Sequence, residues 1–452
     1  MRTLSPPAIV AVSLLAISRP AATAPAAPSE HPTNVIVMIA DGCGPASVGL
    51  GRMVAGQPLA LDAIEMGTCR TGSASSRVTD SAAAATALAS GVKTANGVVG
   101  QDTTGRVLVT LLERARERGM ATGLVAKSTI TDATPAAFAA HVRNRSSEDT
   151  IAVQEIEHAV DVLLGGGREW FLPASRGGSR HDSVDVIALA RSRGYAYVAT
   201  RRELAAARRL PLLGLFAGDD MSYAIDRQGI EEPSLPEMAD QALKLLGGRK
   251  PGFFLMVEGS LIDHAGHAND PATHARELLE YDATVRAVLE FARRDRHTLV
   301  VCTADHETGG LGLGRRLGER NYYELRIETL RPVTASTARM ADSIAAGAVP
   351  DSVVARYTGT PLSDDERTIL APAVAARNGV QAALGEIESR RALVAWTSGG
   401  HTAVDVGLYA FGPGSERFRG AHENTDIAHL LAERMGVRLS PERPASASAA
   451  GR

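Results

Sequence analysis

Residues with metal-binding side chains follow three short apolar runs of this 452-residue sequence. They are Asp41 after Val35–Ala40, Glu258 after Phe253–Val257, and Asp305 with His306 one residue beyond Leu299–Thr303. In an open α/β sheet, ligands bind outside the carboxyl ends of the strands. A single acidic residue in such a place is more simply explained as a turn residue or a helix N-cap. Three runs with the same ending favour a metal cluster at one edge of a sheet.

Two further segments carry the same chemistry. Asp263 and His267 lie four residues apart, so a helical turn would place both side chains on one face, and His264 lies between them. His401 follows two glycines in another segment. Zinc binds histidine nitrogen and aspartate oxygen, and a site with three protein ligands leaves a position for water or substrate. These residues therefore extend the predicted metal cluster.

A serine in front of an alanine-rich stretch is the candidate nucleophile. Ser81 follows Asp80 and begins the run SAAAATALAS, which is typical of a helix because alanine is the best helix former. Unpaired N–H groups at a helix N-terminus favour an anion such as phosphate. Taken alone, Asp80 or Ser81 would more simply be an N-cap. Beside a metal cluster the nucleophile interpretation gains weight, because a metal ion can ionise a serine hydroxyl.

Apolar runs alternate with helical patterns along most of the chain. The runs expected to form buried strands are Val35–Ala40, Thr122–Ala126, Leu212–Ala217, Phe253–Val257, Leu299–Thr303 and Gly407–Phe411. Helices are predicted over Val107–Arg118 and from Asp270-Pro271 towards Arg294. This alternation predicts an α/β fold, a three-layer sandwich in which helices cover both faces of a large, mostly parallel central sheet. Residues 312–391 break the pattern, so we expect an insertion there that forms a cap or an interface region.

The ends and the charge of the chain bear on location and partners. Residues 1–27 combine Arg2, the apolar stretch Ala8–Ile17 and small residues, which predicts a cleavable signal peptide and a periplasmic or secreted protein. No later stretch is apolar for long enough to span a membrane. The net charge of −3, without a basic run, argues against nucleic acid as a dedicated partner. Residues 440–452 are composed like a disordered tail.

Six segments in a fixed order carry a resemblance to a known family. They are IADGCG, VTDSAAAATALASGVKT, TDATPAAFAAH, VEGSLIDHAGH, TADHETGG and GGHT, which begin at residues 39, 78, 131, 257, 303 and 399. Each short motif alone is weak, whereas the ordered set is highly specific. With these segments the chain resembles the alkaline phosphatase family over residues 32–438, apart from the insertion.

The resemblance implies two zinc ions and one magnesium ion per chain. The first zinc would be held by Asp263, His267 and His401. The second zinc, beside Ser81, would be held by Asp41, Asp305 and His306. The magnesium would be held by Asp41, Thr134 and Glu258, with Asp132 reaching it through water. This division agrees with ligand preferences, because imidazole suits zinc whereas carboxylate and hydroxyl oxygens suit magnesium.

The resemblance also implies which residues hold the phosphate group. Arg145 would bind two phosphate oxygens with its planar guanidinium, whereas the nearby Arg143 is interpreted as a solvated loop residue. Asp80 would orient Arg145. His264 stands where members of the family differ, so it would contact phosphate, act through water or tune the pH response.

The reaction implied is the hydrolysis of a broad range of phosphate monoesters through a phosphoserine intermediate. Two alternatives stay open, a phosphodiesterase of the same superfamily and a non-catalytic phosphate-binding protein. The phosphodiesterase would usually lack the third metal site and the arginine clamp, and the binding protein would not need a serine nucleophile. A sulfatase is disfavoured because AAAAT follows Ser81 in place of the C/S-x-P-x-R pattern, and a cytosolic phosphomutase is disfavoured by the signal peptide. Family members are often dimers, so the resemblance leaves a homodimer open.

Overall fold

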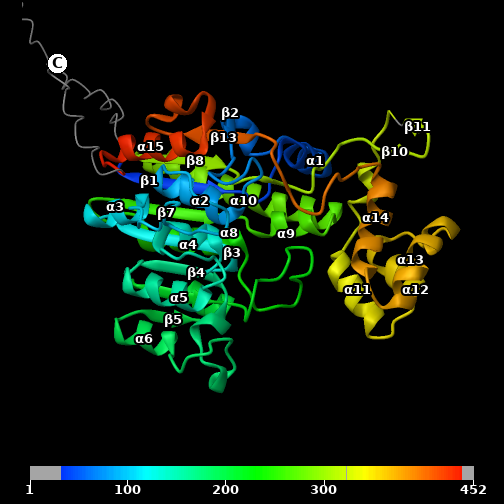
Figure 1. Ribbon diagram of the computed structural model, residues 1–452, viewed down its shortest axis with the longest axis horizontal. Helices are drawn as coiled ribbons and strands as arrows, with labels where there is room; N and C mark the ends of the chain where they lie inside the picture. Colours follow the sequence, from blue (N-terminus) through cyan, green and yellow to red (C-terminus); the bar gives the residue numbers. More distant parts are fainter. Residues whose placement is uncertain (1–31, 322, 440–452) are drawn as a thin grey trace, which may run out of the picture.

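The computed structural model describes residues 32–321 and 323–439. The predicted signal peptide and the predicted C-terminal tail lie outside these residues. A ten-stranded sheet forms the centre of the molecule (Figure 1). Its strands are β1 (Asn34–Ile39), β2 (Glu65–Arg70), β3 (Ala121–Thr129), β4 (Val162–Gly166), β5 (Ala196–Val198), β6 (Leu212–Leu215), β7 (Phe253–Glu258), β8 (Thr298–Thr303), β13 (Val406–Phe411) and β14 (Gly420–Glu423).

The sheet is mostly parallel, as predicted. The strand order is β14-β2-β13-β8-β1-β7-β3-β4-β6-β5. Strand β13 runs antiparallel to both of its neighbours, and the other pairs are parallel. Ile39 of β1 pairs with Glu258 of β7 and with Thr303 of β8, so the carboxyl ends of these three strands are level. All six predicted strands are present within one or a few residues of their predicted limits.

Helices cover both faces of the sheet. One layer contains α2 (Ser81–Ser90), α3 (Leu111–Glu117), α4 (Ala133–Ala139), α5 (Glu148–Glu157), α6 (Val186–Ser192) and α15 (Asn424–Met435). The other contains α8 (Leu235–Leu246) and α10 (Pro271–Asp295), with α1 (Pro45–Ala55), α7 (Arg201–Ala206) and α9 (Leu261–His267) packed against them. Helices α3 and α4 contact β3 and β7, whereas α8 contacts β3 and α10 contacts β8. The fold is the predicted three-layer α/β sandwich.

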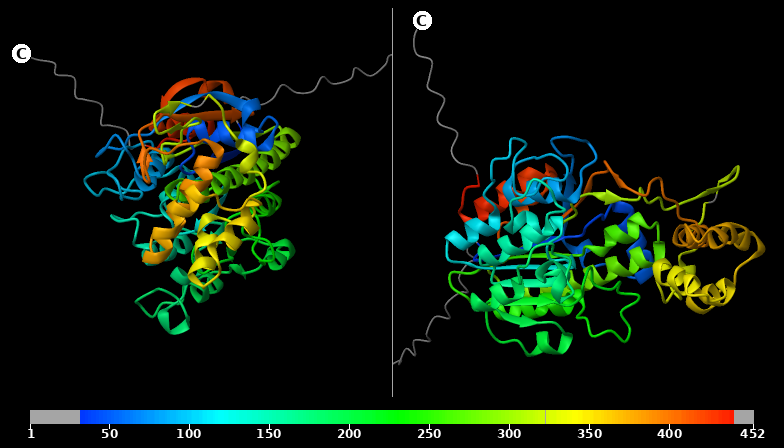
Figure 2. Two further views of the ribbon diagram at one scale, coloured as in Figure 1. Left: turned by 90° about the vertical axis from the view of Figure 1, so that its right-hand side faces the viewer. Right: turned by 60° about the horizontal axis from the view of Figure 1, so that its bottom comes forward.

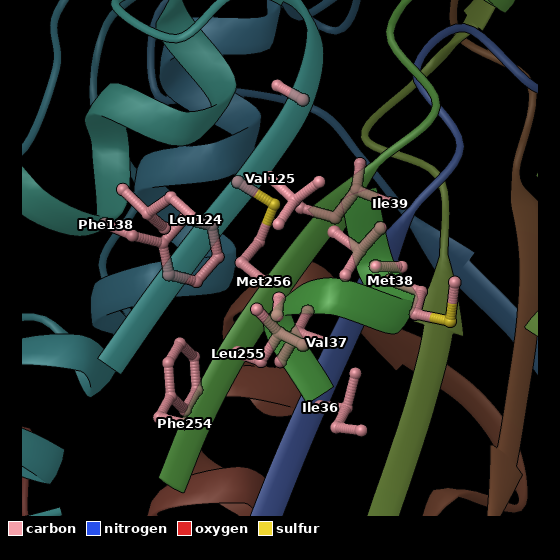
Figure 3. Packing of buried hydrophobic residues seen from close by; sticks show 14 of the residues in the cluster. Ile36, Val37, Met38, Ile39, Leu124, Val125, Phe138, Phe254, Leu255 and Met256 are labelled. Carbon is pink, nitrogen blue, oxygen red and sulfur yellow. The ribbon is translucent and has the colours of Figure 1, made fainter. Parts of the chain in front are cut away.

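The central strands are apolar on both faces because both faces are covered. Every residue of β1, with the sequence NVIVMI, is buried. Figure 3 shows its side chains packed against those of β7 and β3, with Phe138 of α4 lying close to Phe254 of β7. The centroids of these two rings are 6.0 Å apart. Burying one such side chain contributes about 1.5–3 kcal/mol, so this core holds the strand ends in a fixed arrangement.

Capping residues set where the helices begin. The prediction for α10 is confirmed, because the carboxylate of Asp270 accepts a hydrogen bond from the N–H of Thr273 at 2.9 Å. Helix α3 begins later than the predicted Val107. Its N-cap is Thr110, which forms a capping box with Glu113 and thereby fixes the first turn beyond Val107.

A lobe of four helices projects from one end of the sandwich (Figures 1 and 2). The helices are α11 (Thr337–Ala345), α12 (Pro350–Thr358), α13 (Asp364–Ala376) and α14 (Val380–Ala392). They enclose a hydrophobic core of their own, which includes Met340, Leu370 and Ile387. The hairpin of β10 (Arg316–Leu317) and β11 (Arg320–Asn321) precedes them. The lobe lies in the segment predicted as an insertion, and its role as cap or interface stays a prediction.

Within the described part of the chain, no helix combines the length and apolar character of a membrane span.

Candidate metal centre and nucleophile

Four neighbouring strands deliver carboxylates to one edge of the sheet. Glu258 is the last residue of β7, and Asp41, Asp305 and Asp132 follow β1, β8 and β3 respectively. The four strands are adjacent in the order β8-β1-β7-β3 and run parallel, so their carboxyl ends open on the same side. The convergence inferred from the strand endings is therefore present in the structure.

The first cluster lies beside the candidate nucleophile. Asp41, Asp305 and His306 each place a ligand atom within 4.8 Å of the others. The Nε2 atom of His306 is 3.2 Å from Asp305 Oδ2 and 3.5 Å from Asp41 Oδ1. The hydroxyl of Ser81, the first residue of α2, is 3.2 Å from the same Nε2 atom. A cation held by this cluster would be an immediate neighbour of the Ser81 oxygen.

The second cluster contains Asp263, His267 and His401. Helix α9 places Asp263 and His267 on one face, as their spacing predicts, with Nε2 of His267 3.2 Å from Asp263 Oδ2. His401, in β12 (His401–Thr402), brings its Nε2 atom to 3.1 Å from that of His267. The rings of His401 and His306 stack with centroids 3.6 Å apart, so the two clusters are adjacent.

The imidazoles are oriented through their Nδ1 atoms. The carbonyl partners are Gly399 O, 2.7 Å from His267 Nδ1, and Thr79 O, 2.9 Å from His401 Nδ1. An Nδ1–H group that donates to a carbonyl leaves the Nε2 lone pair free for a metal. Thr308 has a related role, because its hydroxyl donates to Asp263 and lies 3.2 Å from His306 Nδ1. These partners could not be predicted from the sequence, since the position of a carbonyl depends on the completed fold.

One glycine is required by this close packing. Gly42 has a φ of +70°, and a Cβ atom there would lie 2.7 Å from the Asp263 Cα and 2.8 Å from the Thr308 hydroxyl. The glycine thus allows the loop after β1 to approach α9 and the segment after β8. It brings Asp41 of the first cluster next to Asp263 of the second.

The two clusters differ in electrostatic balance. Burial, together with the charges of Asp305 and other carboxylates, raises the pKa of Asp41 well above its usual value. Burial also acts to raise the pKa of Asp263, but hydrogen bonding to His267 and the neighbouring imidazoles outweigh it, so this pKa is lowered. The first cluster, with two carboxylates and one imidazole, therefore has an excess of negative charge that a divalent cation would neutralise.

The oxygens predicted to hold magnesium fit a cation as well. Among the described residues, Asp41 Oδ1, Thr134 Oγ1 and Glu258 Oε1 are buried without a hydrogen-bonding partner. The other oxygen of Glu258 accepts a hydrogen bond from Ser260 at 2.8 Å. Burial, followed by the charge of Asp132, raises the pKa of Glu258 to about 8. Unpaired buried carboxylates are unfavourable, so a hard cation with oxygen ligands suits this position.

Asp80 and Arg145 are linked, as the resemblance implies. One oxygen of Asp80 caps α2 through the N–H of Ala83 at 3.0 Å, and the other lies 3.6 Å from an Nη atom of Arg145. Arg145 also donates to Asp132 at 2.9 Å, and its side chain is 30% exposed. The N-cap explanation of Asp80 and its contact with arginine therefore both hold, and the guanidinium stays accessible to a ligand.

His264 does not join either cluster. Its Nδ1 atom lies 3.2 Å from the carboxylate of Asp220, which also accepts the N–H of Thr129. Burial acts to lower the pKa of His264, but the hydrogen bond to Asp220 outweighs it and the pKa rises to about 9. Asp220 could not be predicted as this partner, because nothing in the local sequence places it opposite His264.

A family model described as alkaline phosphatase matches residues 32–437. The chain belongs to the alkaline phosphatase family. Alkaline phosphatase 4 of Bacillus subtilis (strain 168) is 38% identical, over 88% of this chain and 87% of that protein. The crystal structure of a cold-active alkaline phosphatase from the psychrophile Shewanella sp. matches with a TM-score of 0.82 at 33% identity, over 89% of this chain and 99% of that chain. A mutant of the TAB5 alkaline phosphatase with Mg bound in the M3 site matches with a TM-score of 0.68 at 28% identity, over 90% and 99%.

Membership of the alkaline phosphatase family decides the class of reaction. The protein is an enzyme, a phosphoric monoester hydrolase. The matching structures share the α/β sandwich, and the grouped carboxylates and imidazoles are suited to metal binding.

Proposed function

We propose that the protein hydrolyses a broad range of phosphate monoesters through a phosphoserine intermediate on Ser81. The observation that carries this proposal is the 3.2 Å contact between the Ser81 hydroxyl and His306 Nε2, at the N-terminus of α2. The contact joins the hydroxyl of the first residue of α2 to the buried group of Asp41, Asp305 and His306. A helix N-terminus also favours the negative charge of the phosphate.

The metal positions form part of the proposal. Zinc would be held by Asp263, His267 and His401 at one position and by Asp41, Asp305 and His306 at the other. Magnesium would be held by Asp41, Thr134 and Glu258, with Asp132 acting through water. The unpaired buried oxygens and the Nδ1-anchored imidazoles support these assignments. When bound, such ions stabilise the charge on the attacking and leaving oxygens and on the phosphoryl group.

The protein side chains have distinct roles in the proposed reaction. Ser81 Oγ gives its proton to solvent water and attacks phosphorus, forming an O–P bond while the bond to the leaving alcohol breaks. The departing alkoxide takes a proton from water. Arg145 holds two phosphate oxygens, and Asp80 keeps the guanidinium in place. Water then attacks the phosphoserine, which releases inorganic phosphate and restores the Ser81 hydroxyl.

The test replaces the nucleophile and compares two esters. Ser81→Ala should lower kcat for p-nitrophenyl phosphate by roughly 10³-fold or more, because the covalent route is lost. Ser90→Ala is the matched control, since Ser90 lies at the other end of the same helix and bonds only to the Thr86 carbonyl and a neighbouring N–H. Acid quenching of the wild-type reaction should yield a peptide phosphorylated at Ser81.

The same assay separates the alternatives. A monoesterase should prefer p-nitrophenyl phosphate to its bis-ester, and the presence of Arg145 and Glu258 supports that preference. A strong preference for the bis-ester would favour a phosphodiesterase, and phosphate binding without turnover would favour a binding protein. Wild-type turnover in Ser81→Ala would refute the proposed mechanism.

A further inference from the structure

A third group of carboxylate and imidazole side chains lies outside the proposed active site. Glu113, His141 and His158 each place a ligand atom within 4.8 Å of the others. Glu113 belongs to α3, His141 follows α4, and His158 is the C-cap of α5. These three helices lie in one layer of the sandwich (Figure 1). Nothing in the proposed reaction uses these three side chains.

The carboxylate of Glu113 is held in a fixed orientation. One of its oxygens accepts the N–H of Thr110 at 2.8 Å as part of the capping box of α3. The other oxygen, Oε1, lies 2.9 Å from Nε2 of His141. The capping contact therefore directs Oε1 towards the imidazole of His141.

Both imidazoles are anchored in the manner of metal ligands. His141 Nδ1 lies 2.8 Å from the carbonyl of Gly100, and His158 Nδ1 lies 2.6 Å from the carbonyl of Ala139. Donation from Nδ1–H to a carbonyl leaves Nε2 as the lone-pair nitrogen of each ring. His267 and His401 of the active site are anchored in the same way, with one carboxylate beside them. The group thus repeats the composition and the tautomer control of the second active-site cluster.

An ion pair alone accounts for only part of this arrangement. Burial acts to lower the pKa of His141, but the hydrogen bond and the charge of Glu113 outweigh it, so the pKa is raised and a protonated His141 would pair with Glu113. The pairing gives no reason for the placement of His158, whose ring centroid is 5.8 Å from that of His141. The side chains of His141 and Glu113 are 8% and 24% exposed, so the group is shielded but open to a small ion.

We propose that Glu113, His141 and His158 bind a divalent transition-metal ion, for which zinc is the best match. Two imidazole nitrogens and one carboxylate oxygen form a ligand set that zinc accepts, with water in the fourth position. Tetrahedral zinc with ligands at about 2.0–2.2 Å separates the ligand atoms by roughly 3.3 Å. Glu113 Oε1 is 2.9 Å from His141 Nε2, and all three ligand atoms lie within 4.8 Å of one another. Small side-chain rotations would therefore complete the site.

The ion would crosslink three helices rather than take part in the reaction. It would join α3 and the end of α5 to the segment after α4, the helix whose first turn carries Thr134. His141 is also tied to Gly100, and the same loop accepts the Arg145 N–H through the Gly97 carbonyl. The bound metal would thus stabilise the layer of helices that supports the phosphate-binding side.

The test counts zinc in the complete protein. Wild type and variants are saturated with zinc, freed of excess metal by gel filtration and measured by elemental analysis. His158→Asn should hold one zinc per chain fewer than wild type, because asparagine keeps an N–H donor for the Ala139 carbonyl but removes Nε2. His297→Asn, at an exposed histidine, is the matched control and should hold the wild-type number. An unchanged count in His158→Asn would overturn the proposal and leave an ion pair only.

Two further measurements keep the proposal falsifiable. If His158→Asn does not fold, Glu113→Gln gives the same readout, because glutamine preserves the capping box while removing the charged ligand. In crystals of zinc-loaded wild type, anomalous scattering at the zinc edge should show a peak between Glu113 and the two imidazoles. A map with peaks at the active site and none there would also overturn it. Neither readout depends on Ser81 chemistry, so failure here would be distinct from failure of the proposed reaction.

Discussion

Replacement of Arg145 by alanine tests the phosphate-binding role of the guanidinium. The side chain contacts Asp132 at 2.9 Å and approaches Asp80, and the remaining N–H groups are available to a phosphate. Arg143, two residues earlier, is exposed and belongs to the same loop. The two arginines therefore form a matched pair in which only Arg145 is positioned by the carboxylates near Ser81.

The expected loss follows from the hydrogen bonds that Arg145 would make. A hydrogen bond to a charged group contributes about 1.5–3 kcal/mol, so two of them amount to about 3–6 kcal/mol. The side chain is 30% exposed, and water would partly replace the missing donors, which favours the lower end of this range. A loss of about 3 kcal/mol corresponds to roughly a 100-fold lower kcat/KM, because each factor of ten is about 1.4 kcal/mol.

Steady-state kinetics with p-nitrophenyl phosphate and inhibition by inorganic phosphate measure this effect. Arg145→Ala should lower kcat/KM by roughly 100-fold and weaken inhibition by phosphate, whereas Arg143→Ala should stay within about twofold of wild type. A change below about threefold in Arg145→Ala would refute the reasoning. A larger loss in Arg143→Ala than in Arg145→Ala would refute it too, since the wrong arginine would then hold the phosphate.

Two further predictions concern stability. Asp270→Ala should lower the free energy of unfolding by about 2–4 kcal/mol in urea titrations, because the cap on Thr273 N–H and the bond to the buried Thr337 N–H are both lost; a change below about 0.5 kcal/mol would contradict it. In EDTA-treated protein, the free energy of unfolding should fall as the pH rises from about 5 to 9. Burial and the charge of Asp132 raise the pKa of Glu258 to about 8, so the folded protein keeps a proton that the unfolded chain releases near 4.5. The stability that this proton contributes is fully present below the pKa of Glu258 in the unfolded chain, and it is lost as the pH rises through the pKa of Glu258 in the folded protein. Urea midpoints across this range should vary less in Glu258→Gln, and an equal slope would contradict the assignment.

The parts of the fold that were predictable are those with an unbroken apolar run. Strands such as β1 are buried along their whole length, and their sequences show it. β2 and β14 have no such run, because most of their residues are exposed or half-buried near one edge of the sheet. β4 ends in two glycines, which resemble a turn signal. The four helices of the lobe were not predicted, because loop residues are the clearest feature of the sequence in that segment.

The candidate site divides in the same way. Glu258 is the last residue of β7, and Asp41 and Asp305 come two residues after the ends of β1 and β8, so topology alone brings them together. The groups that orient the imidazoles depend on where loops and carbonyls lie after folding, and Thr308 and Asp220 carry no local signal. Glu113 and His141 are 28 residues apart in sequence and belong to no spacing motif, so only the packed helices reveal them as neighbours.

The wide separation of the ligands along the chain has a consequence for biogenesis. Asp41 lies near the start of the described sequence and His401 near its end, with β8 and the helical lobe emerging between them. A nascent chain therefore cannot assemble both clusters until nearly all of it has been synthesised. Long-range pairings of this kind slow folding. We expect catalytic activity to appear abruptly, once nearly the whole chain has been synthesised. Truncated chains that lack His401 should have no detectable activity.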